Sequence, residues 1–82
     1  MNEEKLDKII KMAMKTLESN GYSLSKYESV EVLKKGNNLM LFFSNFYDTS
    51  MLFRVVIIKD NGKYYVEVNR RKYELKEVGK NE

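Results

Sequence analysis

The hydrophobic positions along this chain follow two different periods, and the change between them separates one helix from a set of strands. From residue 3 to residue 19, apolar residues recur at the i, i+3, i+4, i+7 spacing that gathers them on one face of an α-helix. The residues on this face are Leu6, Ile9, Ile10, Ala13, Met14 and Leu17. Asn20-Gly21 follows as a stop signal, because glycine readily adopts the left-handed conformation that ends a helix.

After a connector at residues 22–28, apolar and polar residues alternate, which is the period of a β-strand. Short runs that contain glycine, asparagine or aspartate interrupt the alternation. Asp60-Asn61-Gly62 is the clearest of these hairpin signals. We therefore predict strands at residues 29–35, 39–45, 51–59, 63–68 and 72–78, followed by a frayed tail at 79–82.

Every predicted connection between strands is short, and short connections join antiparallel neighbours. The 82 residues are enough for a single domain with one modest core. The sequence thus predicts an α+β fold, with the N-terminal helix packed on a four- to five-stranded antiparallel β-meander. This layout resembles the cystatin-like and PepSY-like arrangements, in which a meander grips a helix. The Gln-x-Val-x-Gly loop by which cystatins block cysteine proteases is not present, so the resemblance implies a fold and no function.

The chain contains neither cysteine nor histidine, and this narrows the chemistry open to it. Disulfides, thiolate zinc sites and cysteine nucleophiles are excluded, and the commonest general base is missing. The acidic residues of the strand half are explained by turns and solvated faces rather than by a converging pair. We therefore predict that the protein is not an enzyme and that it has no catalytic residues, no metal site and no cofactor.

The longest apolar runs, Leu39–Phe43 and Val55–Ile58, are far too short to span a bilayer. The start of the chain lacks the basic and then apolar pattern of a signal peptide. We therefore expect a cytoplasmic protein without membrane contact, located in the host cytoplasm if the protein is viral. The net charge of +3 permits contact with nucleic acid but does not require it.

One helix can cover only one face of a sheet, and the predicted strands carry apolar residues on both faces. The second face is expected to show Met40, Phe42, Leu52, Val56 and Ile58 around a single Arg54. A contiguous exposed apolar patch of this kind usually marks an interface. Two alternatives would hide it: the connector from Tyr22 to Tyr27 folds over this face, or strong curl closes the sheet on itself.

The C-terminal strands interleave cations with tyrosines, a composition typical of surfaces that bind single-stranded nucleic acid. The candidate residues are Lys63, Tyr65, Arg70, Arg71 and Lys72. Arginines at a hairpin tip can also contact a phosphate backbone or an acidic partner. The structural alternative is that these cations protect exposed strands from aggregation.

The sequence thus favours a small protein-binding module that acts through its open sheet face, either as a homodimer or with a foreign protein partner. No small-molecule substrate is inferred. Small, cysteine-free, lysine-rich domains resemble the accessory proteins of phages and mobile elements. That class includes inhibitors of host defence complexes such as anti-CRISPR proteins, and the resemblance implies steric blockade as the mode of action. The alternative function is a nucleic-acid-binding module that uses the basic, tyrosine-bearing hairpin.

Overall fold

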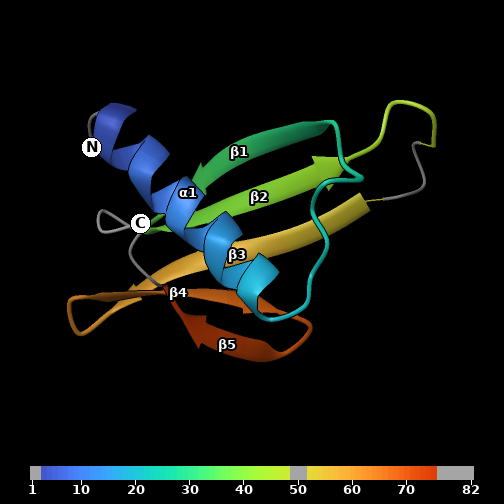
Figure 1. Cartoon of the computed structure of the whole chain (residues 1–82). Coiled ribbons are helices and arrows are strands. Elements are labelled where there is room, and N and C mark those ends of the chain that lie inside the picture. The colour runs from blue at the N-terminus through green and yellow to red at the C-terminus, as the bar shows by residue number, and fades with distance from the viewer. Residues whose placement is uncertain (1–2, 49–51, 76–82) are drawn as a thin grey trace.

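The computed structural model describes residues 3–48 and 52–75, which form one helix and one antiparallel sheet. The elements are α1 (Glu3–Ser19), β1 (Ser29–Lys35), β2 (Asn38–Ser44), β3 (Leu52–Asp60), β4 (Lys63–Val68) and β5 (Arg71–Glu74). The strands lie side by side in chain order, and α1 crosses one face of the sheet (Figure 1). The predicted α+β layout is therefore confirmed. No helix in the described ranges is long and apolar enough to cross a membrane.

Several predicted strand limits are wrong by about one residue, because the hairpin turns are tighter than expected. Lys35 pairs with Asn38, and Val68 pairs with Arg71, so only two residues remain in each of these turns. Consequently β2 begins at Asn38 rather than at residue 39; its end lies at Ser44 rather than at residue 45. In the same way β3 extends to Asp60, which pairs with Lys63, and the predicted first residue of this strand, Met51, lies outside the described residues.

The last strand is predicted at 72–78, and its described part, β5, begins at Arg71 and ends at Glu74. Leu75 no longer belongs to the strand, although its N–H still donates to the carbonyl oxygen of Tyr64 at 2.9 Å. The remainder of the predicted strand, and the expected tail at 79–82, lie outside the described residues.

The core lies between α1 and the face of the sheet beneath it. The helix buries Ile9, Ala13 and Leu17, as its periodicity predicts. These side chains share a core with one set of alternating strand residues, namely Leu39, Leu41, Phe43, Val55, Ile57, Val66 and Val68. Thr16 is also buried, and its hydroxyl donates to the Met12 carbonyl oxygen at 2.8 Å, so the polar group is satisfied inside the helix.

The connector after α1 continues the cover of the same face. The rings of Tyr22 and Tyr27 stack on Phe53 at centroid distances of 5.9 and 5.8 Å, and Tyr27 also contacts Phe43. Phe43 lies opposite Phe53 in the ladder and is buried in the core, so this cluster lies on the face that carries the helix. The alternative in which the connector covers the second face is therefore wrong.

The sheet also stays open, because β1 and β5 are its two edges and do not pair. Closure by curl is thus the second alternative that the structure overturns for the described strands. The helix contacts β4 and β5, so it leaves the β1 side of its own face uncovered. As a result Val30 and Val32 in β1 keep 39% and 40% of their surface exposed.

Candidate functional site

The sheet face opposite the helix, here called the open face, is built by the strand register. One row across all five strands runs Leu33, Met40, Val56, Glu67 and Lys72, each directly opposite the next. A neighbouring row runs Glu31, Phe42 and Arg54, and another runs Ile58, Tyr65 and Glu74. Apolar side chains therefore fill the β2 and β3 part of the face, and charged side chains dominate the β4 and β5 part.

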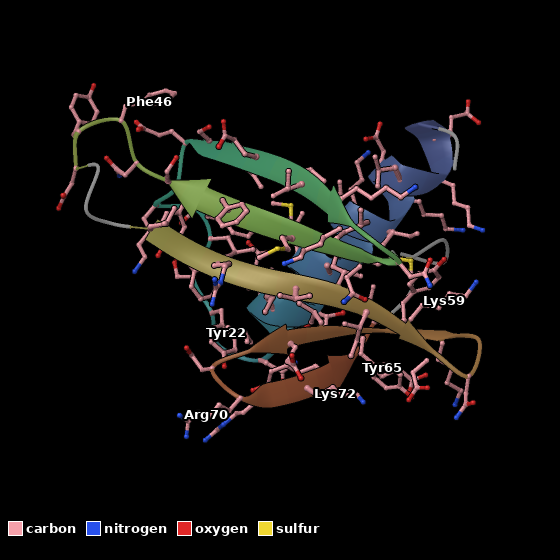
Figure 2. The ribbon with its side chains drawn as sticks, turned by 180° about the vertical axis from the view of Figure 1, so that it is seen from behind. Tyr22, Phe46, Lys59, Tyr65, Arg70 and Lys72 are labelled. Carbon is pink, nitrogen blue, oxygen red and sulfur yellow. The ribbon has the colours of Figure 1, made fainter. Side chains whose placement is uncertain are left out.

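The six residues predicted for the second face, Met40, Phe42, Leu52, Arg54, Val56 and Ile58, do share it. No element among residues 3–48 and 52–75 lies over them; Figure 2 shows the face with α1 behind the sheet. Met40, Phe42, Val56 and Ile58 are half-buried, because they pack against one another along the ladder. Leu52 is 60% exposed, and Leu33, which the sequence analysis did not single out, is 54% exposed.

The candidate residues of the C-terminal hairpin do not form one cationic groove. Lys63 and Arg70 lie at opposite ends of β4. Lys63 forms an ion pair with Glu74 at 3.7 Å, and the ammonium group of Lys72 lies 4.7 Å from the centroid of the Tyr65 ring. Two of the expected cations therefore already interact with side chains of the sheet.

Arg70 stands apart from the other hairpin cations because of its backbone conformation. Asn69 and Arg70 form the β4–β5 turn with φ of 51° and 67°, the same left-handed pair that Asn61 and Gly62 form with φ of 54° and 79°. The second position of such a turn is usually glycine, since a Cβ atom is strained there. Arg70 therefore occupies a strained backbone position at an exposed tip, where its side chain projects away from the sheet (Figure 2).

A shallow hollow of about 410 Å³ brings Arg70 together with Arg54 on the open face. It is also lined by Val56, Glu67, Val68 and Asn69. Within the described part of the chain, neither arginine forms an ion pair. Arg54 and Arg70 thus both border this hollow, and each guanidinium group can donate hydrogen bonds to a carboxylate or another anionic group from outside.

The loop after β2, which lies between the strands predicted at 39–45 and 51–59, presents two aromatic side chains. Phe46 is 69% exposed and Tyr47 is 91% exposed. Three hydrogen bonds fix the backbone beneath them. The N–H of Phe46 donates to a carboxylate oxygen of Glu28 at 2.8 Å, and the Tyr47 N–H donates to the Asn45 side-chain oxygen at 2.8 Å. The Asn45 side-chain amide donates to the carbonyl oxygen of Lys26 at 2.9 Å.

The signal that could have identified this loop is its composition. Turns are usually built from small or polar residues, and two adjacent aromatic residues have no conformational reason to be there. Because alternate connections of a meander lie at the same end of the sheet, the β2–β3 and β4–β5 connections share one end, and Figure 2 shows Phe46 and Arg70 at opposite corners of it. This end, comprising Phe46, Tyr47, Leu52, Arg54 and Arg70, is called the aromatic–arginine end below.

On the helix-bearing face, Tyr22 in the connector and Tyr73 in β5 form a polar side-chain pair. Their hydroxyl oxygens lie 3.3 Å apart. The pKa of Tyr73 lies below its ordinary value because the hydrogen bond with Tyr22 favours its ionised form, and Arg71 lowers it further. The pKa of Tyr22 is raised, first by the same hydrogen bond and then by desolvation. The pair ties the connector to the sheet edge.

The other features of the described surface give less support for a ligand-binding site. A pocket of about 280 Å³ beside Lys5, Lys34 and Lys59 lies at the lower limit of small-ligand pockets. Among the described residues, no three acidic side chains come close enough to hold a metal ion. Comparison of the chain with protein-family models, with curated proteins and with solved structures found no match.

Proposed function

We propose that this protein is a non-enzymatic protein-binding module that docks a partner protein on its open face. The observation that carries the proposal is the apolar part of that face in β2 and β3, which no described element covers and which ends in the largely exposed Leu52. Uncovered apolar surface that is rimmed by charged residues is the usual mark of a protein interface.

The aromatic–arginine end supplies the anchors for such an interface. Aromatic residues and arginine dominate the binding energy of protein complexes, and burial of one large side chain contributes about 1.5–3 kcal/mol. Phe46 and Tyr47 stand on a loop that three hydrogen bonds already hold in place. Binding therefore loses less conformational entropy in ordering this loop than it would with a free segment.

The charges at this end favour a partner of defined chemistry. Arg54 and Arg70 line the same hollow without an internal carboxylate partner among the described residues. A partner surface with an apolar centre and one or two acidic side chains at its edge complements this arrangement. Steric blockade of such a surface is the proposed mode, as for an accessory protein of a phage or mobile element that inhibits a host defence complex of the anti-CRISPR type.

Nucleic-acid binding through the C-terminal hairpin is the second candidate. Lys63 and Lys72 are already engaged within the sheet, and this disposition favours the first proposal. The two functions differ in their response to salt, because release of condensed counterions makes nucleic-acid binding fall steeply as salt rises.

The test is affinity capture from native host lysate, followed by binding measurements with the captured protein after purification. Leu52→Asp and the double variant Phe46→Ala with Tyr47→Ala should each weaken that binding by about tenfold or more. Lys11→Asp is the control, because Lys11 is exposed on α1, on the opposite side of the sheet from the open face and away from β1. Full binding by both open-face variants would refute the proposal. Loss of the captured material after nuclease treatment would support the nucleic-acid alternative instead.

A further inference from the structure

We propose that β1 is a dimerisation edge, at which a second copy of this chain pairs antiparallel with β1 and is centred on Leu33. The two five-stranded sheets would then form one continuous sheet. The contact is made by the β1 edge and not by the apolar part of the open face in β2 and β3, so the inference does not depend on the protein partner proposed above.

The two edges of the sheet differ in a way that singles out β1. In the described part of the chain, the edge strand β5 has four residues and begins with Arg71 and Lys72. Short length and cationic side chains both discourage pairing at a sheet edge. The edge strand β1 has seven residues, and it exposes 39% of Val30, 40% of Val32 and 54% of Leu33. A long edge strand with exposed apolar side chains is a template for another strand.

The backbone of β1 offers the hydrogen-bonding groups that such pairing needs. The β1–β2 turn contains two residues, and Lys35 and Asn38 are the pair that closes it. In a hairpin of this type the closing pair is hydrogen-bonded, and hydrogen-bonded pairs recur at every second residue. The N–H and C=O groups of Val30, Val32 and Lys34 therefore face away from β2, toward the free edge.

The side chains select one register for the pair of copies. When the symmetry axis passes through Leu33, Glu31 lies opposite Lys35 of the second copy, and Lys35 lies opposite the second Glu31. Both are non-hydrogen-bonded pairs, in which opposite side chains come closest. The two Leu33 side chains meet at the centre of the open face. The register centred on Val32 places Glu31 against Leu33, and the register centred on Glu31 places two carboxylates together.

Both charges are available for this contact. Within the chain, Glu31 lies opposite Phe42, and Lys35 lies opposite Asn38. Neither forms an ion pair with a described residue. The chain's own ladder gives these charges no partner, whereas the second copy gives each one a partner of opposite sign. Reversing either charge therefore places no two like charges directly opposite each other within the monomer.

The experiment is a charge swap read by sedimentation equilibrium over a concentration series. The wild-type chain should dimerise. Glu31→Lys and Lys35→Glu should each weaken dimerisation by about tenfold or more, because two attractive pairs become two repulsive ones. The double variant Glu31→Lys with Lys35→Glu should restore it. An equimolar mixture of the two single variants should form a heterodimer, since all opposing charges are then of opposite sign. Circular dichroism should show all variants to be folded.

Three outcomes would overturn the inference. A wild-type chain that remains monomeric up to about 1 mM excludes dimerisation of useful strength. Dimerisation that both single variants retain places the interface elsewhere. Dimerisation that the single variants lose, but that neither the double variant nor the mixture restores, excludes the register centred on Leu33.

Discussion

Replacement of Arg70 by glycine should stabilise the protein, and this expectation tests whether the hairpin tip stores backbone strain. Arg70 has φ of 67° at the second central position of the β4–β5 turn. The same position of the β3–β4 turn is occupied by Gly62 with φ of 79°. The chain thus contains two turns with the same backbone conformation. The β3–β4 turn has glycine at its second central position, which suits this conformation, and the β4–β5 turn has arginine there.

The magnitude follows from two opposing contributions. The left-handed conformation costs a residue with a Cβ atom about 1–2 kcal/mol, and glycine avoids this cost. Glycine in turn loses more conformational entropy on folding, by roughly 0.5–1 kcal/mol relative to alanine. The side chain of Arg70 is exposed and has no ion pair among the described residues, so little else is lost. The net expectation for Arg70→Gly is a gain of about 0.5–1 kcal/mol in the free energy of unfolding.

Urea unfolding followed by circular dichroism measures this gain, and thermal unfolding should show a Tm higher by about 2–8 °C. Arg70→Ala is the matched control, because it removes the guanidinium group and keeps the strain. Its stability should lie within about 0.5 kcal/mol of the wild type. Equal stability of the glycine and alanine variants would refute the strain argument. A glycine variant that is more stable but binds the partner more weakly would show that the strained arginine contributes to partner binding.

Three further expectations concern the core, the connector and the aromatic loop. Leu41→Ala should lower the free energy of unfolding by about 2–5 kcal/mol in urea titrations, because Leu41 is fully buried between the helix and the sheet. Tyr22→Phe should raise the pKa of Tyr73 toward its ordinary value, as followed by the ultraviolet absorbance of the phenolate, since the donor that favours the ionised form is lost. In the wild type, ionisation of Tyr73 stabilises the folded state as the pH rises toward 10, because the pKa of Tyr73 is lowered on folding. Ionisation of Tyr22 destabilises the folded state over the same rise, because the pKa of Tyr22 is raised on folding. Glu28→Ala should speed hydrogen exchange at the Phe46 amide, whose acceptor it removes, while amides in the core exchange as before.

The sequence predicts the element order and the sheet faces well because both depend on local signals. The helix stripe is set by residues three and four apart, and the hairpins are set by short turn sequences such as Asn61-Gly62. The strand limits are less accurate, since a residue such as Asn38 suits a turn by composition and still pairs in the ladder. Whether it does so depends on the turn length, which composition alone does not specify.

The surface features that matter most for binding depend on tertiary geometry, which periodicity does not reveal. The helical stripe shows which side of α1 is buried, but it does not show that α1 lies over β4 and β5 and leaves Val30 and Val32 exposed. The hydrogen bond from the Phe46 N–H to Glu28 joins residues far apart in the chain, and no local pattern indicates it. The left-handed conformation of Arg70 is equally hidden, because arginine is not a residue that such turns favour.

The proposed dimer and the proposed binding face meet at Leu33, which is on the edge strand and on the open face at once. An antiparallel pairing of the two β1 strands would join the open faces and point the aromatic–arginine ends of the two copies in opposite directions. The assembly would then be bivalent, so its avidity for a partner with repeated sites would exceed its affinity for one site. The charge swap on β1 separates the two effects. Glu31→Lys should lower binding to an immobilised, multivalent partner, and the double variant Glu31→Lys with Lys35→Glu, which restores the dimer, should restore that binding. A loss that the double variant does not restore would mean that Glu31 itself contacts the partner.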